Sequence, residues 1–212
     1  DNVDSNTRLC DICGLFDDAE KDEYASLANI NRNARENLLD IMSDLREMLM
    51  EELDDGVKLL ESMELQYLHY PGNSTNDSGG EKSDGKKSGF YQRHYDHTGD
   101  DDKPYRRKVS LLLYLNEEGW NGEMDGGILR AYIRPKKRKK GSRVHRDGGV
   151  NDDSPSTPLT STTTVVKDIV PEGGKLVLFD STLVEHEVLP TCRERWAVVG
   201  WFLIEKESKI GA

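Results

Sequence analysis

The amino-acid sequence carries a helical hydrophobic pattern first and strand patterns afterwards. Between residues 33 and 53, five apolar residues recur at helical spacing, with acidic residues off their stripe: Leu38, Met42, Leu45, Leu49 and Leu53. Ile41 and Met48 widen this stripe. The pattern predicts an amphipathic helix that covers one face of a sheet and ends near Gly56, which has the position of a C-cap glycine.

Beyond Gly56 the pattern is that of short strands. Eight segments rich in β-branched and aromatic residues are separated by turn signals: 64–70, 90–94, 109–115, 127–133, 162–170, 175–179, 184–189 and 196–204. One helix followed by many strands, without strand–helix alternation, argues against a parallel α/β sheet. We therefore predict a mainly β fold with a supporting α-helix, which packs on a sandwich or a jelly roll.

Two stretches between the predicted strands are of low complexity. Residues 73–89 and 134–161 are rich in Gly, Ser, Asp and Lys and poor in apolar residues, so they bury too little surface to offset the cost of ordering their backbone. We expect both to be mobile inserts. The second opens with a basic run, which is a nuclear-import signal, a patch for an acidic partner or a solvated loop.

The first thirty residues are polar and weakly patterned. Cys10 and Cys13 form a single CxxC without a second pair, so we predict two reduced thiols in a flexible segment rather than a zinc site. The expected organisation is an acidic N-terminal segment, 1–60, that carries the helix 33–53, followed by a β domain, 61–212, with the two inserts.

Charge and cysteine content exclude several classes of protein. The 212 residues have a formal net charge of −11, and most of the acidic excess lies in the N-terminal segment, so no basic domain for nucleic acid is present. No apolar run approaches the roughly 20 residues of a membrane span. Three cysteines do not make a disulfide scaffold, and no leader is visible. These features favour a cytoplasmic or nuclear protein without a membrane partner.

The candidate chemistry is a metal site. His94 and Asp96 share one face of an extended strand end, because alternate residues point to the same side. His186 lies on a late strand that a jelly roll can bring beside the first. Two histidines and one carboxylate form the facial triad of non-haem Fe(II) oxygenases. Arg195 opens the last strand, and its guanidinium suits the distal carboxylate of a dicarboxylic cosubstrate. The remaining histidines are not expected to be ligands: His69, His97 and His145.

The stretch 70–202 resembles the prolyl hydroxylase branch of the Fe(II)/2-oxoglutarate dioxygenases, and it is most similar to the hypoxia-inducible-factor type. Six segments in family order carry the resemblance: YPGN at 70–73, YQRHYD at 91–96, LYLN at 113–116, GGILR at 126–130, HEV at 186–188 and RWA at 195–197. Arg195 stands where the collagen-type branch usually has lysine, which favours the hypoxia-factor type. The family's early strand is not recognisable in residues 1–30.

The resemblance implies a double-stranded β-helix, or jelly-roll, core and a set of site residues. His94, Asp96 and His186 would bind Fe(II), and Arg195 would pair with 2-oxoglutarate, with O2 as the other cosubstrate and L-ascorbate as an accessory reductant. Other side chains are assigned to the pocket by the resemblance: Tyr114 as a hydrogen-bond donor to the same carboxylate, Tyr70, Leu112, Leu129 and Val188 as the wall, Trp201 near the metal and Arg107 against a peptide substrate at the entrance.

The activity implied is hydroxylation of a prolyl residue in a peptide or protein substrate, with succinate and CO2 as products. Two alternatives stay open: a related dioxygenase that oxidises another side chain or a small molecule, and a non-catalytic metal-binding jelly roll. The presence of the whole triad together with Arg195 and Tyr114 argues against the non-catalytic protein, because a decayed site would have lost one of them.

Overall fold

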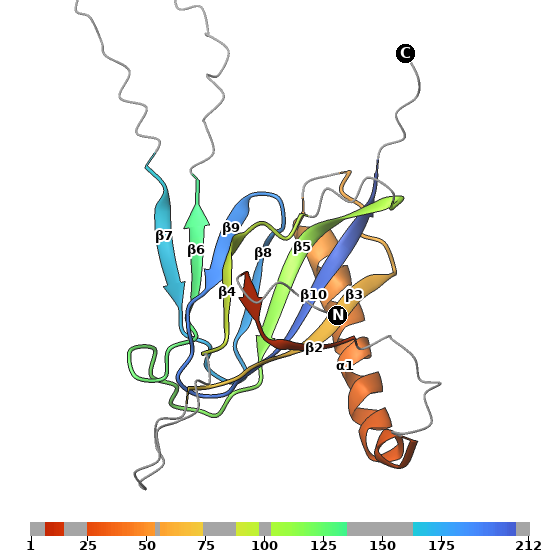
Figure 1. Cartoon of the computed structure of the whole chain (residues 1–212). Coiled ribbons are helices and arrows are strands. Elements are labelled where there is room, and N and C mark those ends of the chain that lie inside the picture. The colour runs from red at the N-terminus through yellow and green to blue at the C-terminus, as the bar shows by residue number, and fades with distance from the viewer. Residues whose placement is uncertain are drawn as a thin grey trace, which may run out of the picture.

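The computed structural model describes residues 7–14, 25–53, 56–73, 88–97, 103–134 and 163–206. Two antiparallel sheets face one another, and a helix lies beside one of them (Figure 1). The first sheet has the order β1-β4-β9-β6-β7 and the second has the order β2-β3-β10-β5-β8. This arrangement is a jelly roll and confirms the predicted fold class.

The elements follow the predicted order along the chain. The bounds are β1 (Arg8–Leu9), β2 (Asp11–Gly14), α1 (Ala25–Glu52), β3 (Met63–Tyr70), β4 (Phe90–His94), β5 (Tyr105–Tyr114), β6 (Leu129–Ile133), β7 (Val165–Ile169), β8 (Leu176–Asp180), β9 (Val184–Val188) and β10 (Arg195–Glu205). All eight predicted strands are present. The largest difference is at β5, which begins four residues before the predicted 109, because the polar residues in front of its apolar run also pair with β10.

Strand β10 is buried on both faces and separates two hydrophobic layers. Alternate residues face the space between the sheets: Ala197, Val199, Trp201 and Leu203. Val198 and Phe202 face the other way, toward α1. A strand covered on both sides has a nearly continuous apolar sequence, which is why β10 shows no polar alternation.

Helix α1 covers the outer face of the second sheet, as predicted. All five residues of the predicted stripe belong to the layer between α1 and this sheet, and Met42 is fully buried there. The predicted widening of the stripe is wrong: Ile41 and Met48 are 58% and 64% exposed. The helix begins at Ala25, earlier than the predicted residue 33, because its first turns lack the apolar spacing on which the prediction rested.

The N-terminal segment is structured, contrary to the prediction of a flexible segment around Cys10 and Cys13. Strand β1 pairs with β4 in the first sheet, and strand β2 pairs with β3 in the second sheet. The segment 7–14 therefore joins the two sheets along one side (Figure 1). Strands of two and four residues are too short for a sequence period to be visible.

The two predicted inserts fall almost entirely outside the described residues. The strands that flank the second insert are hydrogen-bonded neighbours, and Ile133 at the end of β6 faces Val165 at the start of β7. Within the described ranges no helix is both long and apolar enough to cross a bilayer.

Candidate metal centre and its cavity

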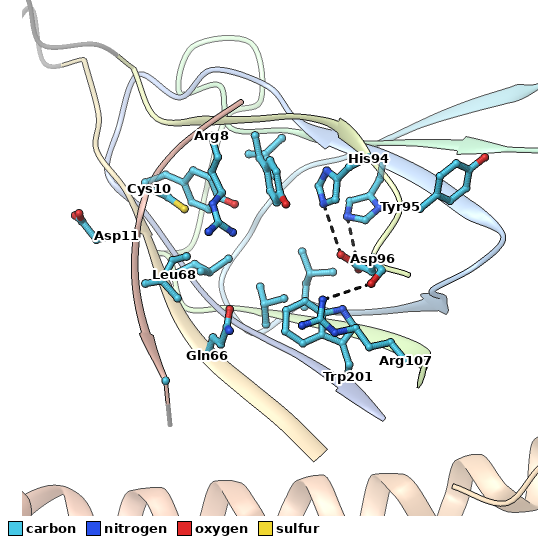
Figure 2. Close-up of a pocket in the computed structure, with 18 residues that line it drawn as sticks. Arg8, Cys10, Asp11, Gln66, Leu68, His94, Tyr95, Asp96, Arg107 and Trp201 are labelled. Atoms are coloured by element: carbon cyan, nitrogen blue, oxygen red, sulfur yellow. Dashed lines mark hydrogen bonds and ion pairs between the residues drawn. The ribbon is translucent and has the colours of Figure 1, made fainter. Parts of the chain in front are cut away.

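His94 and His186 face one another across neighbouring strands. Strand β4 pairs with β9 in a register that places these two histidines directly opposite each other, and their rings are 4.4 Å apart. Asp96 follows the end of β4 and turns between them. The Nε2 atom of His94 is 3.5 Å from Oδ1 of Asp96, and Nε2 of His186 is 3.7 Å from Oδ2 (Figure 2).

Both imidazole rings are held from behind by the strand that carries them. The Nδ1 atom of His94 is 2.6 Å from the carbonyl oxygen of Gln92, and Nδ1 of His186 is 3.3 Å from that of Val184. A carbonyl oxygen only accepts, so each Nδ1 carries a proton, and Nε2 is the ring nitrogen that faces Asp96 and can bind a metal. This orientation by a backbone carbonyl is characteristic of metal-binding histidines.

The charge states of Asp96 and His186 suit a cation. Burial opposes the ionised form of Asp96, but the neighbouring His94 and His186 outweigh it and hold the pKa of the carboxyl well below its usual range. Burial lowers the pKa of His186, although Asp96 partly offsets this effect. The site therefore offers an ionised carboxylate, and burial favours the neutral, metal-binding form of His186.

The geometry fits a single metal ion. Ligand atoms about 2.1 Å from a common ion and at right angles would lie about 3 Å apart. One ligand atom from each of His94, Asp96 and His186 lies within 4.8 Å of the others, and the Oδ2 atom of Asp96 is buried without a hydrogen-bond partner. Of the histidines predicted not to be ligands, His69 and His97 are outside this group, and His145 lies outside the described residues.

A cavity of about 600 Å³ opens next to the three ligands. Four residues assigned to it by the sequence line its wall: Tyr70, Leu112, Val188 and Trp201. Leu129 is fully buried in the same hydrophobic layer, but it lies behind the wall. Leu112 and Val188 supply apolar surface beside charged side chains of the same cavity, among them Asp96 and Arg107.

Arg195 is buried behind this wall, beside Tyr70, without a counter-ion, and like Tyr114 it does not itself line the cavity. It has no exposed surface, and its guanidinium carbon lies 4.8 Å from the ring of Tyr70 and 5.0 Å from that of Tyr114. Within the described residues, its three side-chain nitrogens have no hydrogen-bond partner. The Tyr114 hydroxyl has none either. Burial raises the pKa of Tyr114, with Arg195 partly opposing, so the phenol stays protonated and can donate.

An unpaired guanidinium in a dry site is costly, and a carboxylate is the group that would satisfy it. Arg195 and Tyr114 together offer donors that match the distal carboxylate of a dicarboxylic acid. The residues present therefore fit both a metal ion and a dicarboxylate cosubstrate.

Arg107 lies at the other side of the metal group. Its guanidinium stacks on Trp201 at 3.5 Å and is held by Glu64, with Nε 2.8 Å from Oε2. It also donates a long hydrogen bond, 3.4 Å, to the backbone carbonyl of Asp96 (Figure 2). Arg107 thus lines the cavity, where the sequence placed it, and it also supports the loop that carries Asp96.

The sequence missed several residues of the site. Arg8 and Cys10 enter the cavity from the N-terminal strands, Tyr91 stacks on His94 at 3.7 Å, and Phe179 meets the edge of His186 at 4.8 Å. Burial raises the pKa of the Cys10 thiol, which argues against a thiolate ligand. Tyr91 lies within a motif recognised in the sequence, but no local signal assigned it to the metal.

The fold and the site together define a class of protein. A jelly roll that presents two histidines and one carboxylate at the mouth of a cavity is the architecture of a mononuclear non-haem iron oxygenase.

The family model described as the 2OG-Fe(II) oxygenase superfamily matches residues 82–203, and the chain belongs to this family. No curated protein sequence is detectably similar to the chain.

Similar solved structures carry the same fold. A prolyl-4-hydroxylase from Pseudomonas putida is 28% identical with a TM-score of 0.57, over 98% of this chain and 77% of that one. A Trichoplax adhaerens prolyl hydroxylase, solved with a hypoxia inducible factor oxygen degradation domain peptide fragment, is 21% identical with a TM-score of 0.52, over 92% of this chain and 63% of that one. A prolyl 4-hydroxylase from Phytophthora capsici is 22% identical with a TM-score of 0.52, over 89% of this chain and 47% of that one.

The chain is therefore a dioxygenase that uses Fe(II), 2-oxoglutarate and O2, as its family implies. When bound, iron and 2-oxoglutarate supply the oxidising chemistry, while the protein positions the reactants and excludes water.

Proposed function

We propose that the protein hydroxylates prolyl residues in a peptide or protein substrate and releases succinate and CO2. In this proposal His94, Asp96 and His186 hold the iron, and Arg195 and Tyr114 hold the distal carboxylate of 2-oxoglutarate. The observation that carries the proposal is the combination of the His94–Asp96–His186 group, whose carboxyl is ionised, with a fully buried arginine that lacks a counter-ion within the described residues.

The same residues explain how the cosubstrate would be oriented. Arg195 opens β10 and lies opposite Tyr70 in the register of β10 with β3, whereas the histidines lie on β4 and β9 of the facing sheet. A dicarboxylate between the two sheets would have one end at Arg195 and the other at the triad. The apolar wall from Leu112 and Val188 would fix its carbon chain between these ends.

The prolyl substrate is supported by the family and by the likeness to the Pseudomonas putida prolyl-4-hydroxylase. Arg107 on Trp201 forms a cationic and aromatic surface beside the metal group on which a peptide could lie. L-ascorbate would keep the iron reduced between turnovers and belongs in the assay for that reason.

The test is a hydroxylation assay with Fe(II), 2-oxoglutarate and ascorbate. Proline-containing peptides should each gain one oxygen atom by mass spectrometry, at proline, with one succinate formed per hydroxylation. The matched control replaces each proline by alanine. Oxygen found on another side chain, or succinate formed without any peptide product, would contradict the prolyl assignment and point to another substrate of the same chemistry.

A further inference from the structure

The segment 7–14 forms one side of the catalytic cavity. Because β1 pairs with the first sheet and β2 with the second, the segment passes from one sheet to the other. Alternate residues of an extended chain point to the same side, and Arg8, Cys10, Ile12 and Gly14 all line the cavity. Two charged side chains of this segment line the cavity, Arg8 and Asp11.

Arg8 points into the cavity (Figure 2). Its guanidinium carbon lies 4.9 Å from the centre of the Tyr91 ring, and Tyr91 is the residue that stacks on His94. The Nε atom of Arg8 is buried and has no hydrogen-bond partner. No ion pair joins Arg8 to an acidic residue among the parts of the chain that the structure describes.

The other charged side chains of the cavity wall are engaged. Asp11 accepts a hydrogen bond of 3.0 Å from His69, and Arg107 is held by Glu64. Asp96 lies between the two metal-binding histidines. Arg8 is thus left as a cation that faces the cavity without a counter-charge from the described wall.

The cosubstrate does not supply that counter-charge. One carboxylate of 2-oxoglutarate matches Arg195, and its other end faces the triad, so both anionic ends have partners. The anion that Arg8 can bind must then come from the substrate.

We propose that Arg8 determines substrate specificity by binding an acidic side chain, Asp or Glu, close to the residue that is hydroxylated. This proposal rests on the peptide substrate proposed above and names its chemistry. A guanidinium fork binds a carboxylate through two parallel hydrogen bonds, and the Tyr91 ring holds the fork in place by a cation–π contact.

The test uses pairs of proline-centred peptides in which one Glu, moved through the positions that flank the proline, is compared with Gln. Affinity for the protein loaded with Mn(II) and 2-oxoglutarate is measured by fluorescence anisotropy, and hydroxylation by the Fe(II) enzyme is measured by mass spectrometry. For at least one position, the Glu peptide should bind and react about tenfold better than its Gln partner.

Arg8→Gln should abolish this preference, because affinity and turnover of the Glu peptide should fall to the level of its Gln partner. Arg8→Lys should restore part of the preference, because it keeps the charge but not the planar fork. Arg8→Glu should reverse it in favour of a Lys peptide. Lys167→Gln is the matched control: it removes one positive charge from the exposed strand β7, and the preference should persist.

The outcomes separate this proposal from the prolyl assignment. Three results would overturn the role of Arg8: a Glu preference that survives Arg8→Gln, the lack of any Glu preference, or a higher cosubstrate requirement in Arg8→Gln. Acidic peptides that bind through Arg8 but yield no hydroxyproline would instead overturn the prolyl assignment and leave the role of Arg8 standing.

Discussion

Replacing Arg195 by methionine separates the cosubstrate role of this arginine from any role in the fold. The side chain has no exposed surface, its nitrogens have no hydrogen-bond partner within the described residues, and two tyrosine rings surround it at 4.8 and 5.0 Å. Arg195→Met would break no hydrogen bond that these parts of the chain make. The free energy of unfolding without ligand should therefore stay unchanged or rise, as when buried ions are replaced by apolar residues.

Affinity for 2-oxoglutarate should respond in the opposite direction. Truncating one partner of a buried charge pair costs about 2–5 kcal/mol, which corresponds to an increase in Kd of about 30-fold to several thousand-fold. Tyr114→Phe removes one neutral hydrogen bond, worth about 0.5–1.5 kcal/mol, or an increase of about 2- to 13-fold. The loss of affinity should be larger for Arg195→Met than for Tyr114→Phe because the guanidinium is charged and the phenol is neutral.

Two measurements check the argument. Isothermal titration of 2-oxoglutarate into the Mn(II)-loaded protein gives Kd, and denaturant unfolding with and without cosubstrate gives the ligand-induced stabilisation. At about 100 times the wild-type Kd, this stabilisation should be about 2.7 kcal/mol for the wild type and no more than about 0.9 kcal/mol for Arg195→Met. Affinity for Mn(II) should be unchanged.

Three results would refute the reasoning. Equal losses of affinity in Arg195→Met and Tyr114→Phe would mean that the carboxylate is held in another way. A large loss of stability in ligand-free Arg195→Met would mean that the arginine has a structural partner. Loss of Mn(II) binding would mean that the surroundings of Arg195 and the triad are not independent.

The remaining predictions concern the metal, the packing of β10 and the second insert. His186→Ala should lower metal affinity by more than the roughly 10–100-fold that loss of an outer-shell partner costs, whereas His69→Ala, outside the triad, should leave it unchanged in equilibrium dialysis. Gly200→Ala should lower the free energy of unfolding by about 1–3 kcal/mol in urea titration, because its Cβ would lie 2.3 Å from Leu65 Cδ2 and 2.6 Å from a backbone carbonyl oxygen. Replacing 135–160 by a short Gly/Ser linker should preserve metal binding and uncoupled 2-oxoglutarate turnover, because the flanking strands are paired and long loops add little closure cost, about 0.6 kcal/mol per doubling of length. If the basic run recruits an acidic partner, the same replacement should weaken substrate hydroxylation at low salt, and the weakening should shrink as salt rises.

The strands could be predicted because most of them cover one side of a buried layer. Their apolar residues and the turns between them gave all eight segments, and the helical stripe gave α1 and the face it covers. The width of the stripe was overestimated at Ile41 and Met48, since a helix packed on a flat sheet buries a narrower face than its sequence pattern suggests. Burial of a residue at the edge of a helical face is decided by its neighbours in space.

The triad illustrates a different limit of sequence reasoning. The spacing of His94 and Asp96 is local, and the sequence alone places both on one strand end. That His186 faces His94 follows from strand order and register, which a hydrophobic period does not contain. The resemblance to known dioxygenases supplied this long-range information. Arg8 could not be assigned to the cavity from the sequence, because the strands that place it there are only two and four residues long.

Asp96 and Arg195 carry opposite charges that do not neutralise each other, so the site is complete only when ligands are bound. Asp96 stays ionised between His94 and His186 because the two imidazoles outweigh the effect of burial on its pKa. Arg195 is equally buried, yet no ion pair joins it to Asp96 or to any other acid of the described residues. Each charge is therefore left for a ligand of opposite sign, a cation at the triad and a carboxylate at the arginine. Because unpaired buried charges reduce stability, the ligands that satisfy them should also stabilise the fold. The size of that stabilisation measures how far the triad and Arg195 are left without partners in the chain itself.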